Sequence, residues 1–198
     1  MAPLPDDCWN AWTPEMLAVR LSGLDATWYV AGGWALDLWL GQKTRDHEDL
    51  EFVVRPAEAP LAAAHLDDLT FYTARQGALT EARLDQPIPE DVWQMWGADL
   101  AAGCWRVDMM IERGTPTTWA YKRAPEVTVP RSLAVRVGAG GIPILAPHLV
   151  LLFKARHCRP KDDADFQRFV PILDAKDRAD LRDLLVRLHP DHKWIAAL

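Results

Sequence analysis

The sequence predicts an α+β protein, in which residues 1–143 mix helices with strands and residues 144–198 form a small helical region. Three observations predict this organisation. Short runs of strand-forming residues alternate with helical patterns in the first part of the chain. A stretch rich in glycine and proline ends at residue 143, and apolar residues after it recur at helical spacing. Hydrophobic residues make up 49% of the 198 residues, which suits a folded core and excludes a disordered chain.

The first helix is the best marked element of the N-terminal part. Thr13 is a favourable N-cap, Pro14 suits the first helical position, and Gly23 follows the end of the helix. The next elements are predicted from strand formers, from apolar alternation and from the glycines at their ends. They are a strand over residues 28–31, a turn at 32–33, a helix over 34–40, a strand over 49–54, a helix over 60–69 and a hairpin around Gly77 within residues 71–84.

The middle of the chain gives weaker signals. Pro87 and Pro89 interrupt residues 86–97, which are expected to form a loop or part of a helix. The C-terminal helices are clearer, because leucines recur at helical spacing and a proline after His189 stops the last of them. The remaining predicted elements are strands over 105–111 and 127–129 and helices over 147–157, 162–173 and 177–188.

The net charge of the chain limits the classes of molecule that the protein is expected to bind. The chain has 22 Lys and Arg residues against 28 Asp and Glu residues, a net charge of −6 at pH 7. A protein that grips nucleic acid by bulk charge needs a basic face, so we do not expect a nucleic acid partner. The acidic balance favours a cationic substrate instead.

Cysteine usage and hydropathy predict a cytoplasmic protein. The cysteines are isolated and odd in number, which favours buried thiols in a reducing compartment. No apolar segment of signal-peptide type stands near the N-terminus. The longest uncharged apolar stretch, residues 137–153, is broken by glycines and prolines, so we expect neither a membrane span nor a membrane partner. The three cysteines are Cys8, Cys104 and Cys158.

A glycine pair between a strand and a helix is a candidate phosphate site. The strand that ends at Ala31 runs into Gly32 and Gly33 and then into a helix. Glycines leave the backbone N–H groups accessible at the positive end of the helix dipole, where phosphate binds well. Most double-glycine turns are only turns, so this feature alone does not decide the matter.

Three carboxylates add a candidate metal site to the candidate phosphate site. Asp49 and Glu51 stand two residues apart on a predicted strand and therefore point to the same face. Side by side they repel each other unless a cation lies between them, and hard oxygen ligands suit Mg²⁺. Asp108 is a lone acid on another apolar strand, and it joins them if the two strands are neighbours. The alternatives are a solvated strand face for the first two acids and a pair with Arg106 for the third.

Together these residues resemble a known superfamily. Nucleotidyltransferases of the DNA polymerase β superfamily carry a glycine turn, then a short helix and a strand with the pattern Asp, apolar, Asp or Glu, apolar, and a third carboxylate on a later strand. Ala31-Gly32-Gly33 and Asp49-Leu50-Glu51-Phe52 fit this pattern. The chain is most similar to the group of aminoglycoside 2″-adenylyltransferases and lincosamide nucleotidyltransferases. The residues that it shares with this group are Gly32, Gly33, Trp34, Ala35, Asp37, Gly41, Thr44, Arg45, His47 and Asp49.

The resemblance implies a nucleotidyltransferase fold, which is a mixed sheet flanked by helices and followed by a helical region. It also implies a Mg²⁺-dependent enzyme that moves a nucleoside monophosphate, AMP from ATP, to a hydroxyl of an aminoglycoside-like or lincosamide-like small molecule. Asp49, Glu51 and Asp108 would be the catalytic and metal-binding residues, with Asp108 as general base or as ligand of a second metal. Glu51 is a departure, because the antibiotic enzymes usually have Asp there and the longer side chain reaches one methylene further.

Further residues are candidates for the nucleotide site. Arg45 either holds the triphosphate or pairs with Asp37, and His47 is expected to hydrogen bond within the loop. Trp34 either packs the helix on the sheet or stacks on a base. Lys154 either contacts the nucleotide or extends to solvent. The nucleotide-site candidates are Gly32, Gly33, Trp34, Arg45 and Lys154.

The sequence leaves the acceptor open. Trp93 and Trp96 stand among acidic residues, which could bind a cationic acceptor or could be surface acids around partly buried tryptophans. A second enzyme hypothesis is a toxin-like nucleotidyltransferase that modifies a protein or tRNA. A third is a nucleotide-binding module without transfer activity, for which Glu51 is the supporting feature.

Overall fold

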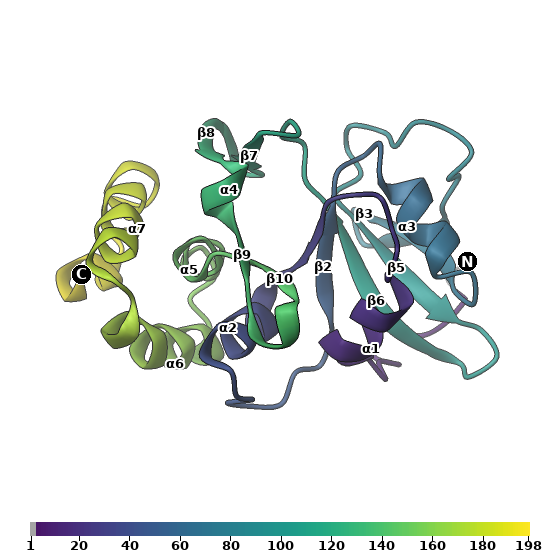
Figure 1. Ribbon diagram of the computed structural model, residues 1–198, viewed down its shortest axis with the longest axis horizontal. Helices are drawn as coiled ribbons and strands as arrows, with labels where there is room; N and C mark the ends of the chain where they lie inside the picture. Colours follow the sequence, from purple (N-terminus) through teal and green to yellow (C-terminus); the bar gives the residue numbers. More distant parts are fainter. Residues whose placement is uncertain (1–2) are drawn as a thin grey trace.

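An eight-stranded mixed sheet forms the centre of the structure, a computed structural model that describes residues 3–198 (Figure 1). Met1 and Ala2, with which the predicted N-terminal part begins, lie outside the described residues. The strand order is β4-β3-β5-β6-β2-β1-β10-β9, and β7 pairs with β8 in a separate hairpin. The strands are β1 (Trp28–Val30), β2 (Glu51–Val54), β3 (Thr70–Arg75), β4 (Ala78–Glu81), β5 (Gln94–Asp99), β6 (Cys104–Ile111), β7 (Thr118–Tyr121), β8 (Ala124–Pro130), β9 (Val135–Val137) and β10 (Pro143–Leu145).

The helices cover the sheet and extend the molecule at one end. The C-terminal helices α5, α6 and α7 gather at the left of Figure 1, and α3 lies with β3 and β5 at the right. α5 is buried almost all round and packs against α2, α6 and α7, as expected for a helix that is apolar on every side. The α-helices are α1 (Pro14–Arg20), α2 (Gly32–Leu40), α3 (Ala59–His65), α4 (Arg131–Ala134), α5 (Pro147–Ala155), α6 (Pro160–Phe169) and α7 (Ala175–Leu188), and short 3-10 segments span Ala139–Gly141, Val170–Ile172 and Lys193–Ala197.

The register of the central strands positions the candidate acids. β2 lies between β1 and β6, antiparallel to the first and parallel to the second. In the parallel ladder Glu51 of β2 is the direct partner of Asp108 of β6. Neighbouring strands lie about 4.8 Å apart and direct partners point to the same face of a sheet. The predicted adjacency of the two acid-bearing strands is therefore confirmed.

Several predicted elements are confirmed in detail. α1 begins at Pro14, and the Thr13 hydroxyl accepts a hydrogen bond from the Met16 backbone N–H at 3.4 Å. β3 and β4 form the predicted hairpin, with Gln76 and Gly77 at its turn. Both turn residues have positive φ angles, 50° and 77°, as the tight two-residue hairpin turn requires.

Other predictions are wrong in their bounds or in the type of element. The two glycines do not form a turn ahead of a helix over 34–40, because α2 already begins at Gly32. Residues 94–99 are strand β5, whereas a loop or partial helix was expected over 86–97. The interrupting prolines precede this strand, and its pairing with β3 and β6 outweighs the weak local signal. β7 and β9 were not foreseen, because strands of three or four residues carry little sequence pattern.

The predicted division at residue 143 falls on the first residue of β10. This strand pairs with β1 on one side and β9 on the other, so the sheet is complete only with residues 143–145. Residues from both sides of the division share one hydrophobic core. Among residues 3–198, no helix is both long enough and apolar enough to cross a membrane.

A buried ion pair fixes the β7–β8 hairpin to the end of β6. Arg131 donates to the Glu112 carboxylate at 2.5 Å, and both side chains are buried. The same carboxylate accepts hydrogen bonds from the backbone N–H groups of Gly114 at 2.5 Å and Ala120 at 3.0 Å. Glu112 therefore holds three separate parts of the chain, and its loss would leave a buried guanidinium and two backbone donors without their acceptor.

Glu112→Ala should lower the free energy of unfolding by about 3–5 kcal/mol, because it breaks a buried pair from one side. Urea denaturation followed by tryptophan fluorescence measures this loss. Glu126→Ala on the same hairpin is the control, since Glu126 is exposed and its replacement should change stability by less than about 0.5 kcal/mol. Equal stability of the two variants would contradict the anchoring role.

Candidate active site

Three carboxylates meet at the start of β2. Glu51 begins the strand, Asp108 lies beside it on β6, and the exposed Asp49 precedes Glu51 by two residues. Asp49 raises the pKa of both other acids through its charge, which places all three within electrostatic reach of one another. Acids from two separate parts of the chain are thus brought together as the sequence predicts.

These acids repel one another strongly. Burial, followed by the charge of Asp49, raises the pKa of Glu51 to about 7. Burial, followed by the charges of Glu51 and Asp49, raises the pKa of Asp108 well above its ordinary value. Lys154 and more distant bases lower the pKa of Glu51, yet they do not offset the repulsion. The cluster is therefore short of positive charge.

Asp108 also has an unsatisfied oxygen. Its Oδ1 atom is buried and has no hydrogen-bond partner among the residues that the structure describes. Trp96 of β5 is the register partner of Asp108 on the other side, and its buried indole Nε1 likewise finds no partner within residues 3–198. Buried polar atoms without partners carry a free-energy cost that a bound ion or substrate relieves. Oxygen-only donors, mutual repulsion and an orphaned buried oxygen together fit a hard divalent cation such as Mg²⁺.

The two glycines at the start of α2 lie close to Glu51 and to the loop that precedes β2. Gly32 has a φ angle of +62°, and a Cβ atom there would lie 1.8 Å from Oε2 of Glu51. A Cβ on Gly33 would lie 2.5 Å from a guanidinium nitrogen of Arg45 and 2.6 Å from the His47 ring. Both positions therefore require glycine, the first for its backbone conformation and for the approach of Glu51. The N-terminus of α2, with its free backbone N–H groups, opens beside the carboxylates.

The loop between α2 and β2 is held by its own hydrogen bonds. Asp37 accepts from the Thr44 hydroxyl at 2.6 Å and from the Thr44 backbone N–H at 3.0 Å, and it bonds His47 Nε2 at 2.6 Å. The prediction that His47 hydrogen bonds within the loop is confirmed. Arg45 does not pair with Asp37, which corrects that alternative. Its guanidinium instead makes two bonds to the buried Asp165 of α6, at 3.1 and 3.2 Å.

Lys154 on α5 is neither free nor extended into solvent. Its ammonium lies 2.9 Å from Asp165 and 3.5 Å from Asp162, and the side chain is buried. Asp165 therefore joins Lys154 to Arg45, and so joins the loop before β2 to two C-terminal helices. Trp34 packs on the His47 ring, with 4.4 Å between ring centroids, and does not line the cavity described next.

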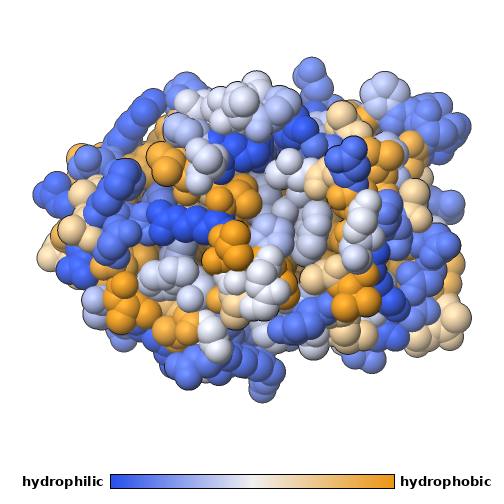
Figure 2. Space-filling model, viewed as in Figure 1, coloured by the Kyte–Doolittle hydropathy of each residue, from blue (hydrophilic) through white to orange (hydrophobic). Residues whose placement is uncertain are grey.

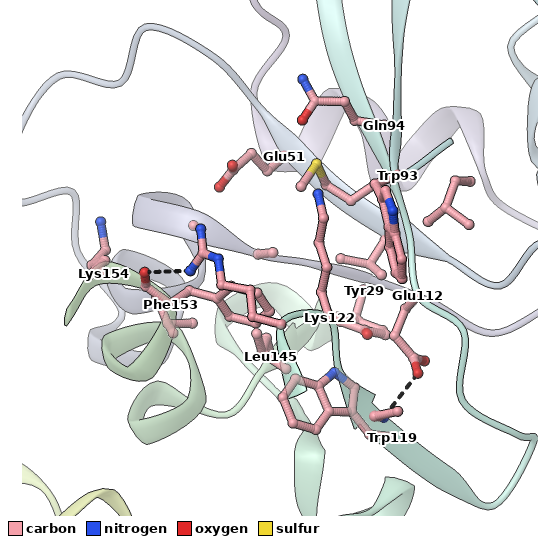
Figure 3. Close-up of a pocket in the computed structure, with 18 of the residues that line it drawn as sticks. Tyr29, Glu51, Trp93, Gln94, Glu112, Trp119, Lys122, Leu145, Phe153 and Lys154 are labelled. Atoms are coloured by element: carbon pink, nitrogen blue, oxygen red, sulfur yellow. Dashed lines mark hydrogen bonds between the residues drawn. The ribbon is translucent and has the colours of Figure 1, made fainter. Parts of the chain in front are cut away.

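A cavity of about 310 Å³ opens beside Glu51 and Gly32 (Figure 3). Its walls come from β1, β2, the strands β5 and β6, the β7–β8 hairpin and α5. Aromatic and basic side chains dominate the lining, whereas Figure 2 shows polar and apolar groups interspersed over the surface that faces the viewer. Sequence reasoning missed Trp119 and Lys122 of the hairpin, because nothing in their local pattern indicates that they line a cavity. The principal lining residues besides Glu51 and Gly32 are Tyr29, Trp93, Gln94, Glu112, Trp119, Lys122, Arg123, Phe153, Lys154, His157 and Arg159.

Comparison with known proteins gives one family and several solved structures. Residues 16–91 match the model of the aminoglycoside-2''-adenylyltransferase family. No curated protein sequence matches the chain. The solution structure of the antibiotic-resistance factor ANT(2'')-Ia has a TM-score of 0.60 and 12% identity, with 89% of this chain and 90% of that chain covered.

Two crystal structures are also similar. ANT(2'')-Ia in complex with adenylyl-2''-tobramycin has a TM-score of 0.57 and 12% identity, with coverage of 85% of this chain and 94% of that one. The lincosamide antibiotic adenylyltransferase LnuA, bound to lincomycin, has a TM-score of 0.49 and 16% identity, with coverage of 88% and 97%. The chain thus has the nucleotidyltransferase fold, and its family match confirms the predicted resemblance to the aminoglycoside-2''-adenylyltransferase group.

Proposed function

We propose that this enzyme transfers AMP from ATP to a hydroxyl group of a small molecule, in a Mg²⁺-dependent reaction in the cytoplasm. The observation that carries the proposal is the direct pairing of Glu51 with Asp108, next to Asp49 and the start of α2. The match to an adenylyltransferase family supports the same reaction. Shared folds alone do not fix chemistry, so the three acids carry the argument.

Each part of the site has a role in this proposal. The backbone N–H groups at Gly32 and Gly33 bind the phosphates of the nucleotide. Asp49 and Glu51 would hold Mg²⁺, with Asp108 as a further ligand or as the base. When bound there, Mg²⁺ would neutralise negative charge on the phosphate groups and help to orient the displacement.

Asp108 is suited to accept a proton. Burial, followed by the charges of the neighbouring carboxylates, raises its pKa well above the ordinary value for Asp when no metal is bound. The burial, which a metal would not remove, makes it a stronger base than an exposed Asp. The acceptor hydroxyl oxygen forms a bond to the α-phosphorus, and its proton passes to the Asp108 carboxylate. The bond between the α-phosphorus and the oxygen that bridges to the β-phosphate breaks, and pyrophosphate leaves.

The proposed acceptor is a small molecule. The resemblance suggests aminoglycoside-like or lincosamide-like compounds, and one solved relative holds an adenylylated tobramycin. A protein or tRNA acceptor and an inactive nucleotide-binding module are the alternatives. Incubation with Mg²⁺ and ATP labelled at the α-phosphorus separates them, because label then appears on a small molecule, on a macromolecule or nowhere.

Asp108→Asn should lower the turnover number by about 10²–10⁴-fold, because the variant lacks the general base. Asp49→Asn should lower it at least as far through loss of the metal. Transfer of the α-phosphorus label measures both. Asp46→Asn is the matched control, since Asp46 is exposed in the same loop and pairs only with Lys43. Full activity of the Asp49→Asn protein would refute the assignment.

Glu51→Gln should change how stability depends on pH when no divalent cation is present. The folded pKa of about 7 lies above the ordinary value of 4.5, so the wild-type protein loses stability as pH rises from about 5 to about 8. The variant is a neutral isostere and should be more stable than the wild type at pH 8 by about 1–3 kcal/mol, with little difference at pH 5.

Urea denaturation at the two pH values measures this difference, with the exposed Glu90→Gln as control. Added Mg²⁺ should reverse the order at pH 8, because it stabilises the carboxylate form of the wild type. If the wild type and the Glu51→Gln variant kept the same stability difference at both pH values, the proposed charge repulsion at Glu51 would be wrong.

A further inference from the structure

Two adjacent cations on the β7–β8 hairpin face the cavity without a carboxylate partner. Lys122 and Arg123 both line it. Arg123 donates to the Phe153 carbonyl at 3.1 Å and contacts His157 Nε2 at 3.1 Å, and neither of these groups is a carboxylate. Lys122 has its ammonium over the Trp93 ring, 5.3 Å from the centroid. Within residues 3–198, neither cation forms an ion pair.

The other cations that line the cavity, Lys154 and Arg159, each have a carboxylate partner. Lys154 pairs with Asp162 and Asp165, and Arg159 pairs with Asp162 at 2.9 Å. Glu112 is paired with Arg131. Once a divalent cation neutralises the catalytic carboxylates, the wall has an excess of positive charge at the hairpin. The Arg123 guanidinium also links the hairpin to α5, through the Phe153 carbonyl and His157.

The Lys122 ammonium lies away from Lys154, whereas the Arg123 guanidinium lies against α5, the helix that carries Lys154. Figure 3 shows the ammonium of Lys122 between Glu51 and Trp93, whereas Lys154 lies on the opposite side of the cavity. The Lys122 ammonium lies beside Glu51, whose register partner is Asp108, so it stands on the side of the proposed base. Burial and the charge of Arg123 lower the pKa of Lys122 itself, so an anion placed between them would stabilise both cations.

We propose that the acceptor hydroxyl compound carries an anionic group, a phosphate or a carboxylate, and that Lys122 and Arg123 bind it while Asp108 faces its hydroxyl. The proposal rests on the proposed nucleotidyl transfer and narrows its substrate class. It departs from the cationic acceptor that the net charge and the aminoglycoside relatives suggest, because two unpaired cations would repel a polyamine such as tobramycin. Phosphate and carboxylate share the chemistry that two adjacent cations recognise.

The test separates the acceptor site from the nucleotide site. The wild-type protein is first saturated with Mg²⁺ and α,β-methylene-ATP, which fills the phosphate positions without reaction. Inorganic phosphate, citrate and tobramycin are then titrated into this complex by calorimetry. Phosphate or citrate should bind and tobramycin should not. A Lys122→Gln/Arg123→Gln variant should bind the anion at least about tenfold more weakly and the nucleotide analogue as the wild type does.

The control is Arg182→Gln/Arg187→Gln, which removes the same charge from exposed positions on α7 and should leave anion binding unchanged. Tobramycin binding to the wild-type complex, or no anion binding to it, would overturn the proposal. If the Lys122→Gln/Arg123→Gln variant no longer bound the nucleotide analogue, the proposal would also be overturned, because the two cations would then bind the triphosphate. Failure of the analogue to bind the wild type would instead refute the proposed transferase function, so the two failures are distinguishable.

Discussion

The contact between Glu51 and Asp108 is the constraint around which the site is organised. Parallel pairing of β2 with β6 places two carboxylates side by side in a partly buried position, and Asp49 adds a third negative charge. Such a cluster does not stabilise the fold by itself, because like charges on neighbouring strands oppose both burial and ionisation of the carboxyl groups. The sheet register therefore imposes a repulsion between carboxylates that a bound cation would relieve. Gly32, which has no Cβ atom, leaves room for the Glu51 side chain. Strain of this kind is typical of a site that is selected for chemistry.

The C-terminal helices belong to the site as much as the sheet does. Asp165 of α6 joins Arg45 of the loop to Lys154 of α5, and all three lie close to the start of α2. The loop that leads into Asp49 is thus fixed from two sides, by its internal bonds to Asp37 and by this bridge. Since β10 also completes the sheet, the residues beyond 143 position the candidate catalytic groups and do not merely follow them.

The part of the fold that the sequence predicts is the part with strong local signals. Thr13 and Pro14 mark α1, and Gly77 marks the first hairpin, because capping and turn geometry act over a few residues. β5 escapes prediction because its pairing with β3 and β6 outweighs a weak local signal, and β7 because four residues carry little pattern. The candidate site likewise contains residues that local patterns predict and contacts between distant residues that they do not. The three acids were predictable from spacing and resemblance, whereas the partner of Arg45, 120 positions away at Asp165, was not.

The net charge of the chain does not indicate the sign of the electrostatic potential inside the cavity. The chain carries a charge of −6, but the acids that produce it lie mostly on the surface or in ion pairs, where they are screened or neutralised. The potential inside a cavity depends on the few groups that lack partners, since the low dielectric there strengthens their effect. Among the described residues of the wall, those groups are Glu51 of β2 and, at the β7–β8 hairpin, Lys122 and Arg123. We therefore expect the acceptor of the proposed reaction to be selected by the charges that remain unpaired and not by the number of charges of each sign in the sequence.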